Sequence, residues 1–485
     1  MKNTLYFGDN LIILRDYIKD ESVDLIYLDP PFKSNQDYNV LFEEQNGSRS
    51  KAQIKAFEDS WRWDQESAEA FQLTVEAGGN VSKAMQAFRM MVGESDMLAY
   101  LSMMAPRLVE LKRVLKPTGS IYLHCDPTAS HYLKMLMDAV FEKGFRNEII
   151  WRYRRWPTKA KQFQKMHDVI LFYSKAKDGS HVFNTLYGYE KLAESTLKAF
   201  GTKKQLADFS SGHRKPGTIE EETQGPPLSD VWEIGIIAPI GKERLGYPTQ
   251  KPEALLERVI RASSNEGDIV LDPFCGCGTA VVVAHRLKRH WIGIDITHLA
   301  INLIRHRLRD AFGPEIEKEF EVIGEPVDLS GARTLAEKDP YQFQFWALGL
   351  VGARPVEEKK GADKGIDGRI YFHDEKNGKT KQVIIQVKSG HISSAQIRDL
   401  RGVLDREQAE IGVFITLEEP SKQMRAESAS AGFYESPATK KRYPKLQILT
   451  IAEVLSGKKI SYPEGWSISP FKKGPGSKIP PSFLF

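Results

Sequence analysis

Four residues near the start of the chain, Asp29-Pro30-Pro31-Phe32, are suited to holding a planar ring that carries an exocyclic amine. The apolar run 23–28 before them predicts a buried strand, so they would lie where that strand ends. A carboxylate and a proline carbonyl can accept the amine protons while the aromatic ring stacks, as in sites for a flipped-out adenine or cytosine. The alternative is a simple turn, because proline pairs commonly follow strands where no backbone donor is needed.

A second motif, residues 272–279 (DPFCGCGT), follows another short apolar run and precedes a segment with the composition of a helix. It predicts a glycine-bearing turn between strand and helix, where Gly276 and Gly278 would let a nucleoside ligand approach the backbone. Asp295 ends the next apolar run, the place where nucleotide-binding α/β folds bind a ribose. A dinucleotide site is the weaker alternative, because Val281 stands where its third glycine would be.

Together these motifs resemble the amino-methyltransferases of DNA, which methylate adenine N6 or cytosine N4 with S-adenosylmethionine. The Asp-Pro-Pro-Phe motif comes before the glycine turn, an order similar to the beta class of that family. The resemblance covers roughly residues 1–310 and implies a Rossmann-like α/β fold with permuted motif order. Its further matches, in order, are Gly8-Asp9, Leu115-Lys116-Pro117, residues 119–124 (GSIYLH), His167-Asp168-Val169-Ile170 and residues 247–252 (YPTQKP).

The resemblance also implies residue roles. Asp29 and the Pro30 carbonyl would hold the target amine, with Pro31 beside them and Phe32 stacked on the base. The residues that would surround the cofactor are Asp272, with Phe274, Gly276 and Gly278 along the methionine part, Asp295 at the ribose, Asp9 near the adenine, and Thr249, Gln250 and Lys251 closing the pocket. Asp at position 29 favours adenine, because cytosine-N4 members more often have Ser there. Methylation of RNA or of a protein glutamine remains a rival, although those enzymes more often have Asn.

Beyond residue 330, a second group of polar residues has the spacing of a metal-dependent nuclease site. Asp367 precedes a predicted strand, and alternation along the strand 382–388 puts Gln386 and Lys388 on one face. Asp367 and Gln386 could bind Mg²⁺ while Lys388 orients a water for phosphodiester attack. The pattern resembles the Mrr-like restriction endonucleases and implies an α/β nuclease domain. A catalytically silent DNA-binding domain is the alternative.

The length of 485 residues and a hydrophobic content of 41% predict several domains with substantial cores. We expect a methyltransferase domain over 1–310 with a target-recognition region at 176–246, a linker at 311–339, a nuclease domain at 340–460 and a tail at 461–485. The net charge of +4 is mild. Basic residues instead gather over 152–165 among Trp151, Tyr153 and Trp156, a mixture suited to phosphates and unstacked bases. Double-stranded DNA is therefore the expected partner, and a homodimer is left open.

Three cysteines give no disulfide framework, and no secretory or membrane-spanning segment is recognisable. We expect a cytoplasmic protein that is encoded by a prokaryote or by its virus. Cys275 and Cys277 lack the partner pair that a zinc site needs, so they are expected to fill space. In the apolar helix predicted over 97–115, Pro106 is expected to cause a kink or a restart.

Overall fold

The computed structural model describes residues 2–31, 63–156, 161–188, 193–208, 215–238, 365–374, 380–463, 467–468, and 241–356 apart from 242, 246 and 248. For residues 200, 205–208, 215–220 and 467–468 only the backbone is described. Phe32 and the basic Lys159, both in segments named above, lie outside these ranges.

The N-terminal part is built on a nine-stranded sheet with the order β11-β1-β10-β9-β2-β3-β5-β4-β8. Pairing is parallel from β11 to β3, antiparallel for β5 with its two neighbours, and parallel again between β4 and β8. The strands are β1 (Asn3–Phe7), β2 (Val23–Leu28), β3 (Leu115–Cys125), β4 (Phe145–Arg152), β5 (His167–Ser174), β8 (Val231–Glu233), β9 (Ile269–Asp272), β10 (His290–Asp295) and β11 (Phe320–Ile323). This is the predicted Rossmann-like α/β fold.

Helices cover both faces of this sheet, as alternation within β2 illustrates. Ile26 and Leu28 face one core and Leu25 and Tyr27 face the other. The first core includes α1 (Asn10–Tyr17), α2 (Gln65–Glu76), α3 (Gly79–Val92), α4 (Asp96–Val114) and α5 (Ser130–Phe141), the last continued by the 3₁₀ turn Glu142–Gly144. The second includes α7 (Glu253–Ser263), α8 (Thr279–Arg286), α9 (His298–Phe312) and the 3₁₀ turn Pro314–Lys318.

Helix α4 continues through Pro106 as a single element, so the expected restart does not occur. A proline inside a helix costs about 3 kcal/mol. Met104, Ala105 and Leu108 are all fully buried beside it. Their packing compensates for the missing backbone donor.

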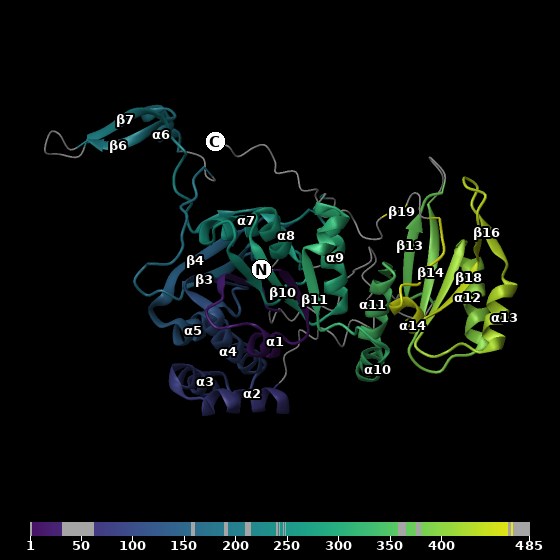
Figure 1. The fold of residues 1–485 in the computed structure, drawn as a ribbon. Helices are drawn as coiled ribbons and strands as arrows, with labels where there is room; N and C mark the ends of the chain where they lie inside the picture. The colour runs from purple at the N-terminus through teal and green to yellow at the C-terminus, as the bar shows by residue number, and fades with distance from the viewer. Residues whose placement is uncertain are drawn as a thin grey trace.

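A small arm stands away from the body of the methyltransferase-like part (Figure 1). It consists of α6 (Glu194–Phe200) and a separate antiparallel pair, β6 (Lys203–Asp208) with β7 (Lys215–Glu222). The arm lies within residues 176–246, where a target-recognition region is predicted.

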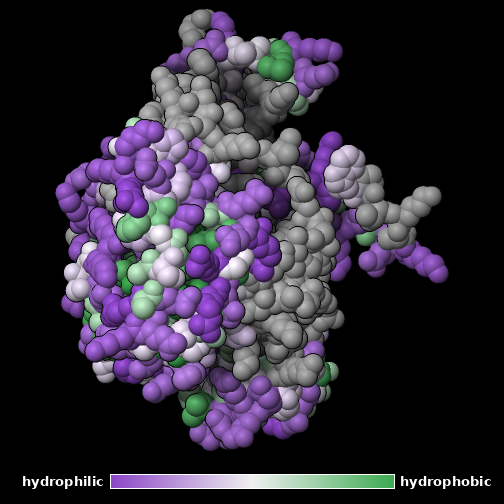
Figure 2. All heavy atoms as spheres, turned by 90° about the vertical axis from the view of Figure 1, so that its right-hand side faces the viewer, coloured by the Kyte–Doolittle hydropathy of each residue, from purple (hydrophilic) through white to green (hydrophobic). Residues whose placement is uncertain are grey.

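The C-terminal part has its own sheet, with the order β12-β13-β14-β15-β18 and β19 paired to β13. Its strands are β12 (Arg354–Pro355), β13 (Gly368–Phe372), β14 (Lys381–Lys388), β15 (Ile411–Thr416), β18 (Leu446–Thr450) and β19 (Ser467–Ile468), beside a hairpin of β16 (Phe433–Glu435) and β17 (Arg442–Pro444). Its helices are α10 (Leu329–Lys338), α11 (Pro340–Leu350), α12 (Ser394–Glu407), α13 (Lys422–Ser430) and α14 (Ile451–Leu455). The outer face of this part is mostly hydrophilic (Figure 2).

The predicted linker, 311–339, is structured. Its strand β11 forms the edge of the large sheet beside β1, so that sheet extends beyond the predicted end at 310. Helix α11 then joins the two parts, lying between them in Figure 1. Its Phe345 carbonyl accepts a bond of 3.0 Å from Asn302 of α9, and its Gln342 accepts one of 3.0 Å from the His298 backbone. In the described residues, no helix is long and apolar enough to span a bilayer.

Candidate functional site

Three acidic residues meet at the carboxyl edge of the large sheet. Asp29 directly follows β2, whereas Asp272 and Asp295 are the last residues of β9 and β10. The strands are adjacent and parallel in the order β10-β9-β2, so their carboxyl ends lie at the same edge. Asp272 and Asp295 are buried, and the Asp29 side chain is 16% exposed. The fold therefore brings together residues that lie far apart in the sequence.

Their mutual repulsion makes this edge receptive to a positive charge. Burial raises the pKa of Asp272 well above its ordinary value, and the charges of Asp29 and Asp295 raise it further. Burial also raises the pKa of Asp295 to about 6, although hydrogen bonds from Thr297 and Gly276 oppose the shift. A cation bound here would stabilise the ionised forms of these carboxyl groups.

The Asp29 carboxylate has a partner on each side. Lys251 Nζ donates to Oδ2 over 2.5 Å, and His124 Nδ1 lies 3.3 Å from Oδ1. Lys251 therefore contacts the carboxylate predicted to hold the target amine. Thr249 lies beside it and accepts a long 3.4 Å bond from Lys251 Nζ at its carbonyl.

His124 is completely buried behind Asp29. Its Nδ1 also lies 3.1 Å from the Tyr27 hydroxyl, and its Nε2 lies 3.3 Å from Asp168 Oδ2. The other Asp168 oxygen accepts a 3.0 Å bond from the Tyr153 hydroxyl. A chain of polar contacts thus runs from Asp29 into the protein.

The turn after β9 is held by its own backbone and by the nearby carboxylates. Asp272 accepts from Phe274 N over 3.1 Å, and Asp295 accepts from Gly276 N over 2.9 Å. Gly276 and Gly278 have φ of +48° and +71°, in the left-handed region that favours glycine. The Asp295 carboxylate therefore stabilises the conformation of the turn directly.

The two glycines serve different neighbours. A Cβ on Gly276 would lie 3.2 Å from the Tyr247 ring, and one on Gly278 would lie 2.7 Å from Ile304 of α9. Packing against Ile304 is therefore one reason for glycine at 278, and the predicted approach of a ligand to this backbone stays a prediction. Cys275 and Cys277 are buried free thiols, and the described residues contain no cluster of three or more His, Cys, Asp or Glu suited to a metal.

Asp9 is the N-cap of α1 and accepts from Leu11 N over 2.7 Å. Arg107 of α4 donates to Asp9 over 2.8 Å and to Asn10 over 2.6 Å, while Asn10 donates to the Pro273 carbonyl over 2.8 Å. Asp9 is therefore linked through Arg107 and Asn10 to Pro273 in the turn after β9, and its place near the adenine of a cofactor stays a prediction. Sequence reasoning missed Asn10 and Arg107, since nothing in the motif marked their coupling to Pro273.

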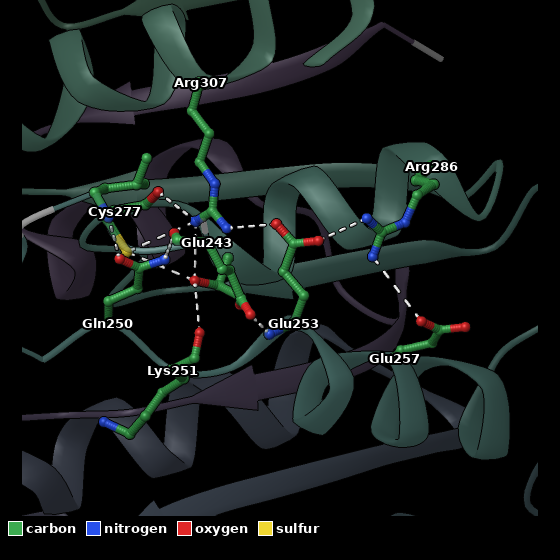
Figure 3. A network of polar contacts seen from close by, with 10 residues as sticks. Glu243, Gln250, Lys251, Glu253, Glu257, Cys277, Arg286 and Arg307 are labelled. Atoms are coloured by element: carbon green, nitrogen blue, oxygen red, sulfur yellow. Dashed lines mark hydrogen bonds and ion pairs between the residues drawn. The ribbon is translucent and has the colours of Figure 1, made fainter. Parts of the chain in front are cut away.

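A buried network clamps the glycine turn from behind (Figure 3). Arg307 of α9, fully buried, donates to the Cys277 carbonyl over 3.0 Å, to Thr279 over 2.9 Å and to Glu253 over 2.8 Å. Gln250, predicted to close the cofactor pocket, bridges its own loop by accepting from Leu245 N and donating to the Glu243 carbonyl, both over 2.8 Å. Sequence reasoning also missed Arg307. A charged residue within the apolar stripe of α9 could have indicated a buried ionic contact.

In the C-terminal part, Asp367 lies against β14. Its Oδ2 accepts a 2.6 Å bond from Val387 N, between Gln386 and Lys388 in the sequence. Gln386 is buried with no hydrogen-bond partner for its Oε1 among the described residues. The predicted alternation is correct, because Val387 packs in one core and Ile384, on the Gln386 side of the strand, packs in the other. Asp367 and Gln386 thus offer a metal ion one carboxylate, which already accepts a backbone hydrogen bond, and one neutral amide.

Residues 23–306 match the family model described as DNA methylase. The chain belongs to this family. The C-terminal residues 342–456 match a second model, described as NACHT-associated inactive Restriction Endonuclease 1. This part is thus similar to an inactive restriction-endonuclease-like domain, whereas the finer Mrr-like assignment has no such support.

Individual proteins resemble the methylase part. The Type II methyltransferase M.HpaI of Haemophilus parainfluenzae is 28% identical over 61% of this chain and 71% of its own length. The DNA adenine methyltransferase YhdJ of Escherichia coli K12 is also 28% identical, over 70% of this chain and 93% of its own. Among solved structures, the complex of M1.HpyAVI with SAM is 18% identical, covers 63% of this chain and 98% of its own, and has a TM-score of 0.33.

The methylase has fewer exposed aromatic residues near its basic stretch than predicted. Trp151 and Tyr153 alternate into the core and are 3% and 5% exposed, so they do not face solvent as platforms for bases. Trp156 and Phe163, in contrast, are 91% and 99% exposed. Arg152 pairs with Glu233, and the Arg155 guanidinium lies 5.0 Å from the Tyr153 ring centre.

Proposed function

We propose that this DNA methylase transfers a methyl group from S-adenosylmethionine to adenine N6 at a specific site in double-stranded DNA, as part of a restriction-modification system. The observation that carries the proposal is the convergence of Asp29, Asp272 and Asp295 at one sheet edge beside a glycine turn. The acids Asp272 and Asp295 suit a cationic sulfonium, which supplies an electrophilic methyl group when bound. The third acid, Asp29, contacts Lys251 and His124 and suits an amine.

In this proposal Asp29 and the Pro30 carbonyl accept hydrogen bonds from the target amine. Asp295 and the turn containing Phe274, Gly276 and Gly278 hold the cofactor, with Asp9 beside them. Methyl transfer is an in-line displacement, so most of the rate comes from positioning the amine against the sulfonium. The clamp by Arg307 supports such positioning, because it fixes the turn to two helices.

Two observations favour adenine over cytosine. The acid at position 29 is Asp, where the cytosine-N4 members of the resembled family more often have Ser. The match with the Escherichia coli relative spans 93% of that protein, which is named as a DNA adenine methyltransferase.

We further propose that the arm formed by α6, β6 and β7 contacts the DNA next to the target base. Lys198, Lys203 and Lys204 are exposed on it, although Lys204 pairs with Glu221 over 2.9 Å. Trp156 and Phe163, in the segment between β4 and β5, are also exposed aromatic residues, and we propose that they contact the same DNA. Such mixtures of cations and aromatic rings suit phosphates and splayed bases.

The test of this function is methyl transfer from labelled S-adenosylmethionine to DNA, RNA and protein in parallel, followed by nucleoside analysis of the product. We expect label in DNA as N6-methyladenine. Asp29→Asn, which keeps the shape of the side chain, should abolish transfer, and the matched variant Asp16→Asn on the exposed face of α1 should not. Label in cytosine, RNA or protein would overturn the assignment.

For the C-terminal domain we propose DNA binding without cleavage, in place of a Mg²⁺-dependent nuclease built on Asp367, Gln386 and Lys388. Two observations favour this choice: the matched model is described as inactive, and Gln386 offers a metal only a neutral amide. Plasmid cleavage with Mg²⁺ and with chelator, on unmethylated and self-methylated DNA, tests it. Mg²⁺-dependent cleavage that Asp367→Ala abolishes would restore the nuclease assignment.

A further inference from the structure

His124 lies beside Asp29, where it could receive a proton from that carboxyl group. Methylation of an amine leaves a positively charged nitrogen, which must lose a proton to give the neutral product. The structure places an imidazole nitrogen 3.3 Å from the Asp29 carboxylate, in a position sealed from solvent. Neither a simple turn nor the packing of the core requires a buried histidine between two carboxylates.

The partners of His124 determine which of its nitrogens carries the proton. Burial, the largest single effect, would raise the pKa of Asp168, but the contacts with His124, the charge of Lys251 and the hydrogen bond from Tyr153 together lower that pKa. Asp168 is therefore an ionised acceptor, so Nε2 of His124 is the protonated nitrogen that faces it. Burial and the charge of Asp29 raise the pKa of Tyr27, which stays a neutral hydroxyl able to donate to Nδ1.

With Nε2 protonated, Nδ1 has a lone pair directed at the Tyr27 hydroxyl and close to Asp29 Oδ1. Two proton acceptors then face each other at 3.3 Å, which leaves a place for one additional proton. The arrangement is an acid, an imidazole and a second acid that orients the ring. Trp151 packs edge-on against the imidazole with ring centres 5.5 Å apart and restricts its rotation.

We propose that His124 is a positioning residue that receives, through Asp29, the proton released by the methylated amine, while Asp168 orients its ring. This inference rests on the proposed methyl transfer. The amine nitrogen forms the bond to the methyl carbon, and the breaking S–C bond leaves its electron pair on sulfur, which becomes a neutral thioether. The nitrogen gives its proton to Asp29, which passes it to His124 Nδ1. The resulting imidazolium is stabilised by Asp168 until the proton reaches solvent.

Other ionisable groups face this chain and belong in any account of its pH dependence. Lys251 contacts Asp29 from the opposite side. The remaining groups are Tyr27 at the end of β2, Tyr153 and Arg155 after β4, and Asp272 at the end of β9. In the proposed step, Nδ1 of His124 can accept a proton only while it carries none, so the pH dependence of the rate tests whether His124 takes part.

The experiment measures methyl transfer in a single turnover on DNA, across pH, for the full chain and for His124→Gln. We expect the variant to lose about 10²-fold or more in rate, the scale of one positioned acid–base group, and to lose the decline in rate that the parent shows at low pH. Affinities for S-adenosylmethionine and for DNA, and the midpoint of unfolding, should match those of the parent. The control His131→Gln makes the same substitution on the exposed face of α5 and should change none of these quantities.

A second variant keeps the test decisive if His124→Gln does not fold. Asp168→Asn retains the side-chain shape but removes the charge that orients His124, and we expect a smaller rate loss with a displaced pH profile. A parent-like rate in either folded variant, or a rate loss with an unchanged pH profile, would overturn the inference. Absence of methyl transfer to DNA by the parent chain would instead overturn the proposed function.

Discussion

The buried carboxyl group of Asp295 links the stability of the free protein to the affinity for its cofactor. Its pKa rises from 3.8 to about 6, with burial as the main cause. The folded state thus binds this proton more tightly than the unfolded state, so the free energy of unfolding falls as pH rises from about 4 to about 6. A shift of about two units, at 1.36 kcal/mol each, corresponds to a decrease in stability of roughly 3 kcal/mol across that window.

Cofactor affinity should have the opposite dependence on pH. An ionised Asp295 favours the sulfonium and accepts hydrogen bonds from Gly276 and Thr297, so affinity should weaken as pH falls through about 6. Asp295→Asn should abolish this pH dependence of binding and flatten the pH dependence of stability. At neutral pH, removal of the buried charge stabilises the fold, while loss of a hydrogen bond worth about 1–3 kcal/mol largely offsets that gain.

Calorimetric titration with S-adenosylmethionine at several pH values, with urea unfolding under the same conditions, checks both effects. Asp16→Asn provides the control, since Asp16 is exposed on α1 in the same domain. In the parent, an affinity that stays constant from about pH 5 to about pH 8 would refute the reasoning about Asp295. So would an Asn variant that retains the slope of the parent.

Three further predictions concern the clamp, the target amine and the DNA. Arg307→Met should destabilise the methylase domain by about 3–5 kcal/mol, the cost of breaking a buried ion pair, and Arg309→Met on the exposed side of the same helix should cost less than about 1 kcal/mol; urea unfolding distinguishes them. Asp29→Ala should remove methyl transfer but leave the calorimetric affinity for S-adenosylmethionine within about twofold of the parent, since Asp29 is assigned to the amine and not to the sulfonium. Replacing Arg154 and Arg155 together by Ala should weaken DNA binding at all sequences and reduce the slope against log salt by roughly 0.9 for each phosphate that is no longer neutralised, as measured by fluorescence anisotropy. A change of sequence preference at unchanged slope would make these arginines base readers.

The sequence predicted most of the elements that carry the site, because hydrophobic runs mark buried parallel strands directly. The run 23–28 is β2, and the predicted strand 382–388 is β14. The sequence could not show which strands are neighbours, since β2 pairs with β9 although the two are far apart along the chain. The meeting of Asp29, Asp272 and Asp295 therefore followed from the family resemblance and not from any local pattern.

A residue type in a motif does not reveal the direction of its side chain. Trp151 and Tyr153 were predicted to form a base-binding surface, but Trp151 in β4 and Tyr153 just after it both point into the core. The Gln250 amide, in a motif predicted at the cofactor pocket, bonds within its own loop. In each case a tertiary contact, invisible in the sequence, determines what the side chain does.

The joint between the two domains explains why the boundary predicted at 310 falls inside a continuous structure. Helix α11 buries Phe343, Trp346 and Leu348 in the C-terminal core while Phe345 packs on Leu299 of α9 and on Tyr247. The Tyr247 ring in turn lies against Gly276 of the proposed cofactor turn. One helix thus completes the core of one domain and supports the wall of the proposed site in the other. A cut at 310 would remove β11 from the sheet and Phe345 from Tyr247, so the methylase fold as a structural unit includes β11 and α11.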